Sequence, residues 1–548
     1  MSLHRSTPRL FAVLSLWILL TVLSSGGCSA LPTPLAATQV AEPTLPPVLP
    51  ASPPAATAKS SAVPESSPQV LAACDTDLQA QAMRAGHVPN WNALGLEACY
   101  ELTLELKPDG QSYAGTARVT FANLTGGDLP DIVFRIYPNS RIIYGGALDI
   151  TSAQVDGRDA ALENFLPDKT AVRLPLETAL PSGAITMIDL QFEGRMPIDF
   201  ASSGVYGIFN YSTEGPIATM ANWYPILAVW DVERGAWSAE RVLGEGDAVV
   251  SETALYRVHV SAPAGWSVVT SGSLLESKSE GNSTTHDFVS GPTRDFMIVT
   301  SPAFESREAE APSGAKGQAN GVRVVHWGLP KDDPSRDTVL EVASGSISVY
   351  DARIGAYPFA ELDVVAVSLQ NASGVEYPGL ILIADDLYTS GPDRWLQVTT
   401  AHEVAHQWWY SVVGNDVLES PWQDEGLTSF TSALYFEDNF PDFYRVLIDF
   451  YELGFDDYKE RERDEPIAQP LSAFRGRGDA YGAIVYAKGA LFFAELREQM
   501  GDDAFFEALQ RYYAENQYAI ASPETLLAAF EASCGCELDT LYAEWGVE

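Results

Sequence analysis

The sequence predicts an α+β multidomain protein in which a largely antiparallel β-domain precedes a mainly α-helical domain. Hydrophobic residues alternate with polar ones from Tyr100 onward, whereas after about Phe304 they recur every three or four positions. The chain has 548 residues, 46% of them hydrophobic, which is enough to build two or three cores. We therefore expect a β-domain over residues 71–305 and a helical domain over residues 306–548.

The first residues have the features of a secretory signal rather than of a folded element. Arg5 and Arg9 precede an apolar run, Leu10 to Leu23, that is too short for a comfortable membrane span and is followed by small residues. We predict a signal peptide over residues 1–27 and an exported protein. Cys28 resembles the lipid-modified first residue of a bacterial lipoprotein, so the product is either a cell-surface lipoprotein anchored at Cys28 or a secreted protein cut nearby.

A spacer is expected after this signal. Residues 28–70 contain ten prolines and no aromatic residue, and Ala, Ser, Thr and Leu make up most of the rest. Such a composition cannot bury a core and favours an extended chain. We predict a disordered tether between the point of attachment and the folded part.

The charge of the chain excludes one class of partner. Asp and Glu number 73 against 33 Lys and Arg, which gives a formal net charge of −40, and no cluster of basic residues stands out. Binding to nucleic acid needs a basic surface that displaces counterions from phosphates. We therefore expect no nucleic-acid partner, and no membrane contact other than the possible lipid anchor.

Four cysteines remain after Cys28, and an even number in an oxidising compartment is consistent with two disulfides. They are Cys74, Cys99, Cys534 and Cys536. Cys74 with Cys99 and Cys534 with Cys536 is one of three possible pairings, and the sequence does not choose among them.

The β-domain begins with a hairpin pattern. Apolar residues alternate from Tyr100 to Leu106, the segment KPDG turns the chain, and the alternation resumes from Ala117 to Phe121. Similar runs recur over residues 132–136, 256–260 and 266–270. The turns come at short intervals, as in antiparallel sheets.

The second domain has helical periodicity. Leu340, Ala343, Ile347 and Tyr350 share one helical face. Further helices are predicted over residues 395–412, 425–437, 484–500 and 502–515. We expect a connector over residues 305–321 and only one short strand region, around residues 362–369.

Two histidines and a glutamate lie within five residues in the segment HEVAH, from His402 to His406. On a helix, residues four apart project from the same face one turn apart, so both imidazoles can reach one zinc ion. Glu403 lies at the rim of that face, where it can take a proton from water without being a ligand. The pattern also fits a core helix, because Trp408 and Val412 continue an apolar face.

A third ligand distinguishes these two interpretations. Catalytic zinc usually has three protein ligands and one open position. Glu425, in the segment WQDEG, follows His406 with 18 residues between them and opens a second predicted helix. A carboxylate buried beside tryptophan is costly unless it is paired or binds a metal. We predict one zinc ion per chain, held by His402, His406 and Glu425.

HEVAH, the 18-residue gap and the Glu of WQDEG resemble the gluzincin aminopeptidases of the aminopeptidase N family, relatives of leukotriene hydrolase. The segment SGVEY resembles that family's GxMEN strand, which implies that Glu376 binds the free amino group of a substrate and that Gly374 belongs to the same substrate site. Tyr481 and Tyr486, in AYGAIVYAKG, match a tyrosine pair whose second member stabilises the oxyanion. The segment TMAN loosely matches a further amine-binding element and gives that role to Asn222.

The resemblance runs from about residue 98 to the last residue. It implies an N-terminal β-saddle domain followed by a thermolysin-like catalytic domain. Val375 and Tyr377 replace Met and Asn in the GxMEN element, so we expect a different pocket for the first side chain. No counterpart of the family's large C-terminal helical domain follows, and we expect a more open cleft or a cover from another subunit.

The predicted function is that of a zinc-dependent aminopeptidase acting on peptides with a free N-terminus. Metal-activated water is the nucleophile, Glu403 transfers its proton, and Tyr486 stabilises the oxyanion. Glu376 pairs with the N-terminal ammonium, so that only the first peptide bond reaches the metal. The alternatives are a thermolysin-like endopeptidase and a catalytically degenerate surface lipoprotein that only binds.

Overall fold

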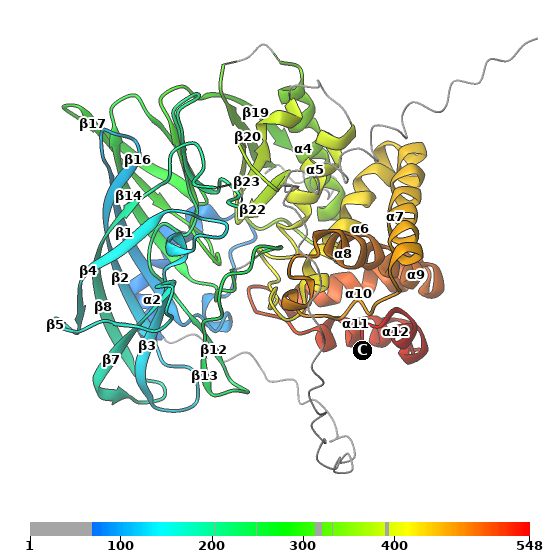
Figure 1. The fold of residues 1–548 in the computed structure, drawn as a ribbon, viewed down its shortest axis with the longest axis horizontal. Coiled ribbons are helices and arrows are strands. Elements are labelled where there is room, and N and C mark those ends of the chain that lie inside the picture. Colours follow the sequence, from blue (N-terminus) through cyan, green and yellow to red (C-terminus); the bar gives the residue numbers. More distant parts are fainter. Residues whose placement is uncertain (1–67, 203, 248, 313–320, 331–332, 389–393) are drawn as a thin grey trace, which may run out of the picture. The chain divides into compact units, whose positions relative to one another are not determined.

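A computed structural model of the chain has strands throughout its first part and helices in its second part, as the periodicities predict (Figure 1). The structure describes residues 68–202, 204–247, 249–312, 321–330, 333–388 and 394–548. The predicted signal peptide, Cys28 and the tether up to residue 67 lie outside these ranges. A helix begins at Pro68, three residues before the predicted end of the tether.

The largest sheet has eight strands in the order β16-β17-β14-β1-β2-β8-β4-β5. Its strands are β1 (Ala98–Leu106), β2 (Ser112–Ala122), β4 (Ala147–Val155), β5 (Arg158–Asp159), β8 (Ile185–Arg195), β14 (Leu255–Pro263), β16 (Ser273–Glu280) and β17 (Ser283–Val289). The predicted hairpin is β1 and β2, with Leu102 opposite Ala117. All neighbours in this sheet are antiparallel except β1 and β14.

Smaller sheets complete the first part of the chain. One contains β15 (Ser267–Thr270), β18 (Ile298–Ser301), β10 (Ile217–Met220) and β9 (Phe209–Ser212). A second contains β11 (Ile226–Leu227), β3 (Leu129–Arg135), β7 (Ala171–Leu180) and β6 (Glu163–Asn164). A two-stranded ribbon joins β12 (Val229–Asp231) and β13 (Ala236–Ser238). The side chains that alternate inward from these sheets form one apolar cluster, which includes Trp223 and Tyr256. The predicted antiparallel β-domain is therefore confirmed as a fold.

A five-stranded mixed sheet follows, and it corrects the expectation of a connector and one short strand region. Its order is β19-β20-β21-β23-β22, with bounds β19 (Glu305–Ala311), β20 (Val322–Gly328), β21 (Glu361–Val367), β22 (Gly374–Tyr377) and β23 (Leu380–Ala384). The predicted domain boundary between residues 305 and 306 falls at the start of β19 and stays a prediction. β19 escaped detection because it is an edge strand in which only Ala311 is buried, so its sequence carries no apolar alternation.

The central strands of this sheet are buried on both faces. Val364 and Ile381 pack into the apolar cluster of the helical part, whereas their neighbours Val365 and Leu382 pack into that of the β-rich part. Successive side chains of a strand point to opposite faces, so a continuous apolar run can serve two cores. This sheet thus joins the two parts of the chain and fixes where its edge strand β22 lies.

The helices are α2 (Pro68–Cys74), α3 (Thr76–Gln79), α4 (Ser335–Arg353), α5 (Arg394–Ala405), α6 (Pro421–Asn439), α7 (Pro441–Arg461), α8 (Gly478–Tyr481), α9 (Gly489–Met500), α10 (Asp502–Glu515), α11 (Pro523–Cys534) and α12 (Asp539–Trp545). Short 3-10 turns are η1 (Ala80–Ala82), η2 (Trp91–Ala93), η3 (Tyr137–Asn139), η4 (Asp385–Tyr388) and η5 (Leu471–Phe474), and η6 (Gly482–Lys488) is a π-helical segment. No helix among the described residues is both long enough and apolar enough to cross a membrane.

The helix predicted over residues 395–412 is shorter than expected, because α5 ends at Ala405. The chain then makes a series of turns that bury Trp408 and Trp409 together. Adjacent residues of a continuing helix would point about 100° apart.

In the turns, Gln407 also reaches the loop between β22 and β23. Its Oε1 accepts from the Gly379 amide at 2.9 Å and its Nε2 donates to Tyr377 O at 3.0 Å.

One of the possible disulfide pairs is present in the structure. Cys534 and Cys536 are joined by a disulfide after α11, whereas Cys74 and Cys99 are free thiols buried in one small cluster. Burial raises the pKa of the Cys74 thiol, and its contact with Cys99 acts in the same direction.

Arg294 ties the β-rich part to the helical part. Its guanidinium is 2% exposed and donates to the carbonyl oxygens of Tyr410 at 2.7 Å, Ser251 at 3.1 Å and Ala519 at 2.5 Å. Three carbonyls that belong to distant segments of the sequence thus share one buried cation.

We predict that Arg294→Met lowers the free energy of unfolding by about 3 kcal/mol, because three buried carbonyl oxygens lose their donor. Urea denaturation followed by tryptophan fluorescence measures the effect. The control is Arg158→Met, which removes an exposed guanidinium 3.7 Å from Glu177 and should change stability by less than about 0.5 kcal/mol. Equal effects of the two substitutions would contradict this role of Arg294.

Candidate metal centre and active site

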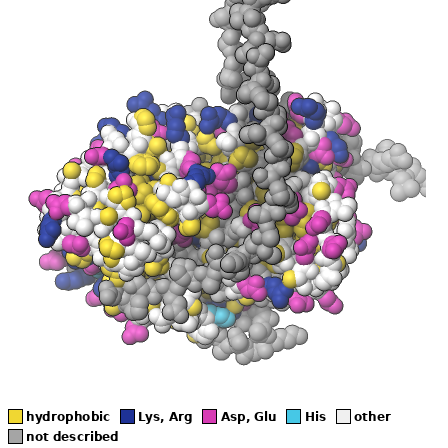
Figure 2. Space-filling view, turned by 90° about the horizontal axis from the view of Figure 1, so that it is seen from below, with side chains coloured by type: hydrophobic (Ala, Val, Ile, Leu, Met, Phe, Trp, Pro, Cys, Tyr) yellow, Lys and Arg dark blue, Asp and Glu magenta, His cyan; other side chains and the backbone are white. Residues whose placement is uncertain are grey.

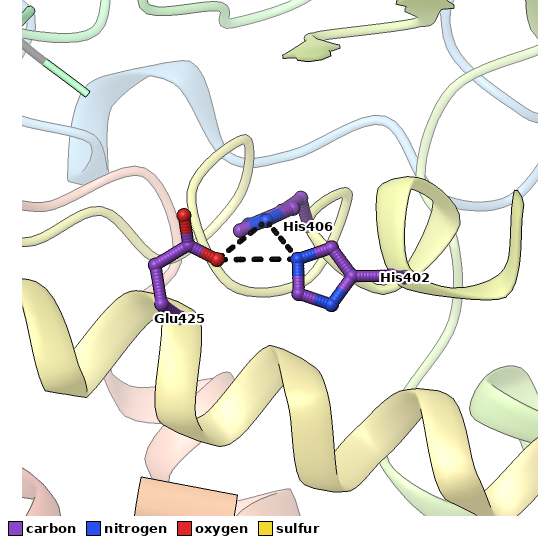
Figure 3. Close-up of side chains that lie close together, drawn as sticks. All are labelled: His402, His406 and Glu425. Atoms are coloured by element: carbon purple, nitrogen blue, oxygen red, sulfur yellow. Dashed lines mark hydrogen bonds and ion pairs between the residues drawn. The ribbon is translucent and has the colours of Figure 1, made fainter. Parts of the chain in front are cut away.

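The three predicted metal ligands converge between α5 and α6 (Figure 3). His402 Nε2 lies 3.1 Å from His406 Nε2 and 3.1 Å from Glu425 Oε2, and His406 Nε2 lies 3.4 Å from the same oxygen. Ligands that surround zinc tetrahedrally at about 2.0–2.1 Å are about 3.3 Å apart. The observed separations are those of a zinc site, so the residues fit the ion that the sequence predicts.

The hydrogen bonds around His406 orient its ring toward this centre. Its Nδ1 lies 2.9 Å from Asp424 Oδ1 and 3.1 Å from Trp409 O, and the carboxylate acceptor fixes the proton on Nδ1. The Nε2 lone pair is then directed at the other two ligands. Asp424 precedes Glu425 in the sequence, but no role was predicted for it; the preference of metal-binding histidines for a carboxylate partner is the signal that could have identified it.

Local structure explains why the ligands meet. His402 is in the last turn of α5 and His406 directly follows α5, with its amide bonded to His402 O at 3.2 Å, so helical spacing continues through both residues. Glu425 is the fifth residue of α6, because that helix begins at Pro421, four residues before the predicted start. All three side chains are largely buried, with His402 at 15% exposure the most accessible.

Glu403 lies beside the ligands without being one of the three. Its side chain is buried and its Oε2 has no hydrogen-bond partner among the described residues. Burial raises the pKa of this carboxyl above its usual range, although His406 acts in the opposite direction. An unpartnered carboxyl of raised pKa next to a metal site is suited to proton transfer.

Gly374 makes room for Glu403. A Cβ at position 374 would lie 2.5 Å from Cδ and 2.6 Å from Cγ of Glu403, closer than van der Waals contact allows. Gly374 therefore leaves space for the Glu403 carboxyl group. It also belongs to the element that was predicted to bind substrate.

Glu376 extends the site along β22, the edge strand. A Glu376 carboxylate oxygen lies within 4.8 Å of both a Glu403 oxygen and a ring nitrogen of His406. The Glu376 side chain is buried. Burial raises the pKa of this carboxyl well above its usual range; His406 opposes the shift and Glu403 adds to it.

The tyrosine pair lies next to the metal ligands. Tyr486, within η6, donates a hydrogen bond from its hydroxyl to Glu425 Oε1, and its ring stacks on that of His402 with centroids 5.9 Å apart. Tyr481 packs edge-on against Tyr486 with centroids 5.5 Å apart. The π-helical turn that carries Tyr486 is a geometry often found at functional sites.

Asn222, which was predicted to lie near the substrate amine, lines a small cavity together with Glu376. Its Oδ1 accepts a hydrogen bond from the Tyr144 hydroxyl at 2.5 Å. Another acid was missed: Asp247 lines the same cavity and reaches Glu376 from a loop that precedes β14. That loop is rich in glycine and has no periodicity, so nothing in the sequence pointed to it.

Figure 2 shows Asp and Glu side chains spread across the face in view, with Lys and Arg interspersed among them. The formal charge of −40 belongs to the whole chain.

Comparisons with known proteins agree with this class of site and fold. Residues 339–545 match the Peptidase family M1 domain. An M1 zinc metallopeptidase from Deinococcus radiodurans has a similar structure, with a TM-score of 0.61 and 18% identity over 83% of this chain and 95% of that chain. A mutant of that protein with a bound Tyr-Ser-Ala substrate superposes equally well.

Sequence relatives match more of the chain than the M1 domain over residues 339–545 does. Aminopeptidase M1 of Arabidopsis thaliana is 23% identical over 53% of this chain and 34% of its own length, and aminopeptidase N of Streptomyces lividans is 21% identical over 81% of this chain and 49% of its own length. The chain thus spans about a third to a half of these relatives. The match to the M1 domain and these relatives confirm the resemblance to aminopeptidase N-type peptidases seen in the motifs.

We predict that removing the metal destabilises the protein, because a ligand that binds only the folded state contributes about 4 kcal/mol at a thousandfold excess over its Kd. Differential scanning calorimetry with a chelator should give a lower Tm, and added zinc should restore it. The His406→Ala variant should show no response to the chelator. An unchanged Tm in the wild-type protein, with no metal found by elemental analysis, would contradict the site.

We predict that Gly374→Ala lowers kcat at least tenfold while zinc binding is retained, because the new methyl group displaces Glu403 and not the ligands. Steady-state kinetics and zinc content measure the two effects. Gly454→Ala in α7 is the matched control, since a Cβ there meets no atom within 4 Å. Full activity of Gly374→Ala would show that this close contact has no role.

Proposed function

We propose that the protein is a zinc-dependent aminopeptidase that removes the first residue from peptides. The observation that carries the proposal is the buried carboxylate of Glu376 within 4.8 Å of the His406 ring and of Glu403. A carboxylate at that place pairs with a substrate ammonium, whose positive charge offsets the cost of burying the anion, and this pairing holds the first peptide bond near the metal. The family relatives named as aminopeptidases and the tripeptide bound to the Deinococcus mutant support the same substrate class.

Each residue has a defined part in the proposed hydrolysis. When bound, zinc supplies a Lewis acid and lowers the pKa of a water molecule. Glu403 accepts the proton of the attacking water and delivers it to the leaving nitrogen. The Tyr486 hydroxyl, which lies beside Glu425 in the structure, turns to donate to the carbonyl oxygen as that oxygen becomes negative.

The His406–Asp424 hydrogen bond is part of this proposal. It keeps the imidazole in the tautomer whose Nε2 is a ligand, and it holds the ring against rotation. The buried Thr428 Oγ1, 3.2 Å from the same Nδ1, lies on the same side of the ring. These groups position a ligand and do not touch the reacting atoms.

Peptides with free N-termini that reach the outside of the cell are the proposed substrates. The support for export is the arrangement of Arg5, Arg9 and the apolar run before Cys28. The lipid anchor at Cys28 is a proposal of the same kind. Radiolabelled palmitate incorporated into the wild-type protein and absent from Cys28→Ser would support the anchor.

The function is tested with a panel of aminoacyl fluorogenic substrates and one peptide in free and N-acetylated forms. We expect hydrolysis of the free peptide, loss of hydrolysis with a chelator, and no cleavage of the acetylated peptide. Glu403→Gln should lower kcat by roughly 10²- to 10⁴-fold, the range for loss of a general base. Unimpaired cleavage of the acetylated peptide would overturn the aminopeptidase assignment, and full activity of Glu403→Gln would overturn the proposed chemistry.

A further inference from the structure

A second group of carboxylates lies next to the metal ligands. Asp247, Glu376 and Asp424 come from three separate segments, and one oxygen of each lies within 4.8 Å of one oxygen of both others. Asp247 belongs to a loop between β13 and β14, Glu376 to the edge strand β22, and Asp424 to α6. Like charges at this distance repel one another in a partly buried site, so the group is suited to a cation.

The described residues leave part of this charge unpartnered. Asp424 is 1% exposed; its Oδ1 bonds to His406, but its Oδ2 has no hydrogen-bond partner among them. No Lys, Arg or His side chain is among the described residues that line the cavity beside Glu376. The buried guanidinium of Arg294 donates to three backbone carbonyls.

The loop of Asp247 is held in place by its neighbours. Gly246 has a φ of +60° and packs so closely on Tyr481 that a Cβ would lie 2.5 Å from the tyrosine oxygen. Glu245 Oε1 accepts from the Gly476 amide at 2.6 Å, and the Tyr206 hydroxyl donates to Gly244 O at 3.2 Å. Asp247 is therefore presented to the cavity by a supported loop.

The three oxygens lie close enough together for one ammonium group to bond to all of them. An ammonium has three N–H donors in tetrahedral directions, and oxygens about 2.8 Å from its nitrogen are about 4.6 Å apart. One oxygen of each carboxylate lies within 4.8 Å of an oxygen of both others, so one ammonium group can reach all three. A divalent ion would need the oxygens to be about 3 Å apart, and the experiment below distinguishes it from an ammonium.

We propose that Asp247, together with Glu376 and Asp424, forms a three-carboxylate receptor for the N-terminal ammonium of the substrate. Asp247 is the new member and takes the part that the motif comparison gave to Asn222. The Asn222 amide oxygen carries no net charge and already accepts one hydrogen bond, from the Tyr144 hydroxyl. Its Nδ2, which has no partner among the described residues, is a donor and cannot accept a bond from an ammonium. The inference rests on the proposed function and extends it to a residue from the β-rich part of the chain.

The test separates binding from turnover. Zinc-loaded Glu403→Gln protein is titrated calorimetrically with trialanine and with N-acetyl-trialanine. We expect the free peptide to bind at least tenfold more tightly than the acetylated one. Adding Asp247→Asn should weaken binding of the free peptide by roughly 10- to 100-fold, as for loss of a charge-assisted hydrogen bond, and leave the acetylated peptide unchanged.

Glu245→Gln is the matched control, because it removes a charge from the same loop but keeps the acceptor for the Gly476 amide. Zinc content and Tm of each variant show that the metal site and the fold persist. If Asp247→Asn and Glu245→Gln bind the free peptide with equal affinity, the inference about Asp247 is overturned and the proposed function is not. If the protein binds a second metal ion and Asp247→Asn abolishes this binding, the three carboxylates form a metal site and not an ammonium receptor. If the starting protein does not prefer the free peptide, the proposed function and the inference both fail.

Discussion

Two imidazole nitrogens and a carboxylate oxygen meet between α5 and α6 at separations of 3.1–3.4 Å. Without a cation, the Nε2 lone pairs of the two histidines would face each other. The buried charge of the Glu425 carboxylate would then lie beside these lone pairs without a positive partner. The rest of the site is arranged around this point. Asp424 fixes one imidazole, Tyr486 bonds the carboxylate, and Gly374 leaves space for Glu403 at the side.

The five-stranded sheet determines which groups can reach that point. Its central strands are buried in both apolar clusters, so its edge strand β22 lies where the helical part and the β-rich part face each other. Glu376 extends from this strand toward the ligands, and the loop of Asp247 meets it from the β-rich part. A metal centre on two helices is thereby combined with acidic groups that are suited to one end of a peptide.

Much of the site could be predicted because its residues repeat at helical or motif spacing. His402, Glu403 and His406 needed only the geometry of a helix, and Glu425 needed the rule of a third ligand. The roles of Glu376 and Tyr486 came from a resemblance, and the structure brings both residues to the metal ligands. Their parts in catalysis are still proposals.

The features that were missed lack such a local signal. β19 is an exposed edge strand without apolar alternation, and Asp247 lies in an irregular loop far from HEVAH in the sequence. α5 ends at Ala405, before turns in which Trp408 and Trp409 are both buried, and this burial depends on tertiary packing and not on helix propensity. Each of these features depends on contacts between segments that are distant in the sequence, and the hydrophobic periodicity of one segment does not predict such contacts.

The central claim is that His402, His406 and Glu425 hold one zinc ion. Anomalous diffraction from crystals of the purified protein, recorded on both sides of the zinc absorption edge, tests it most directly. One strong peak is expected about 2.1 Å from both Nε2 atoms and from a Glu425 oxygen. No peak at that position in zinc-loaded crystals, or a peak held by Asp247, Glu376 and Asp424 instead, would contradict it.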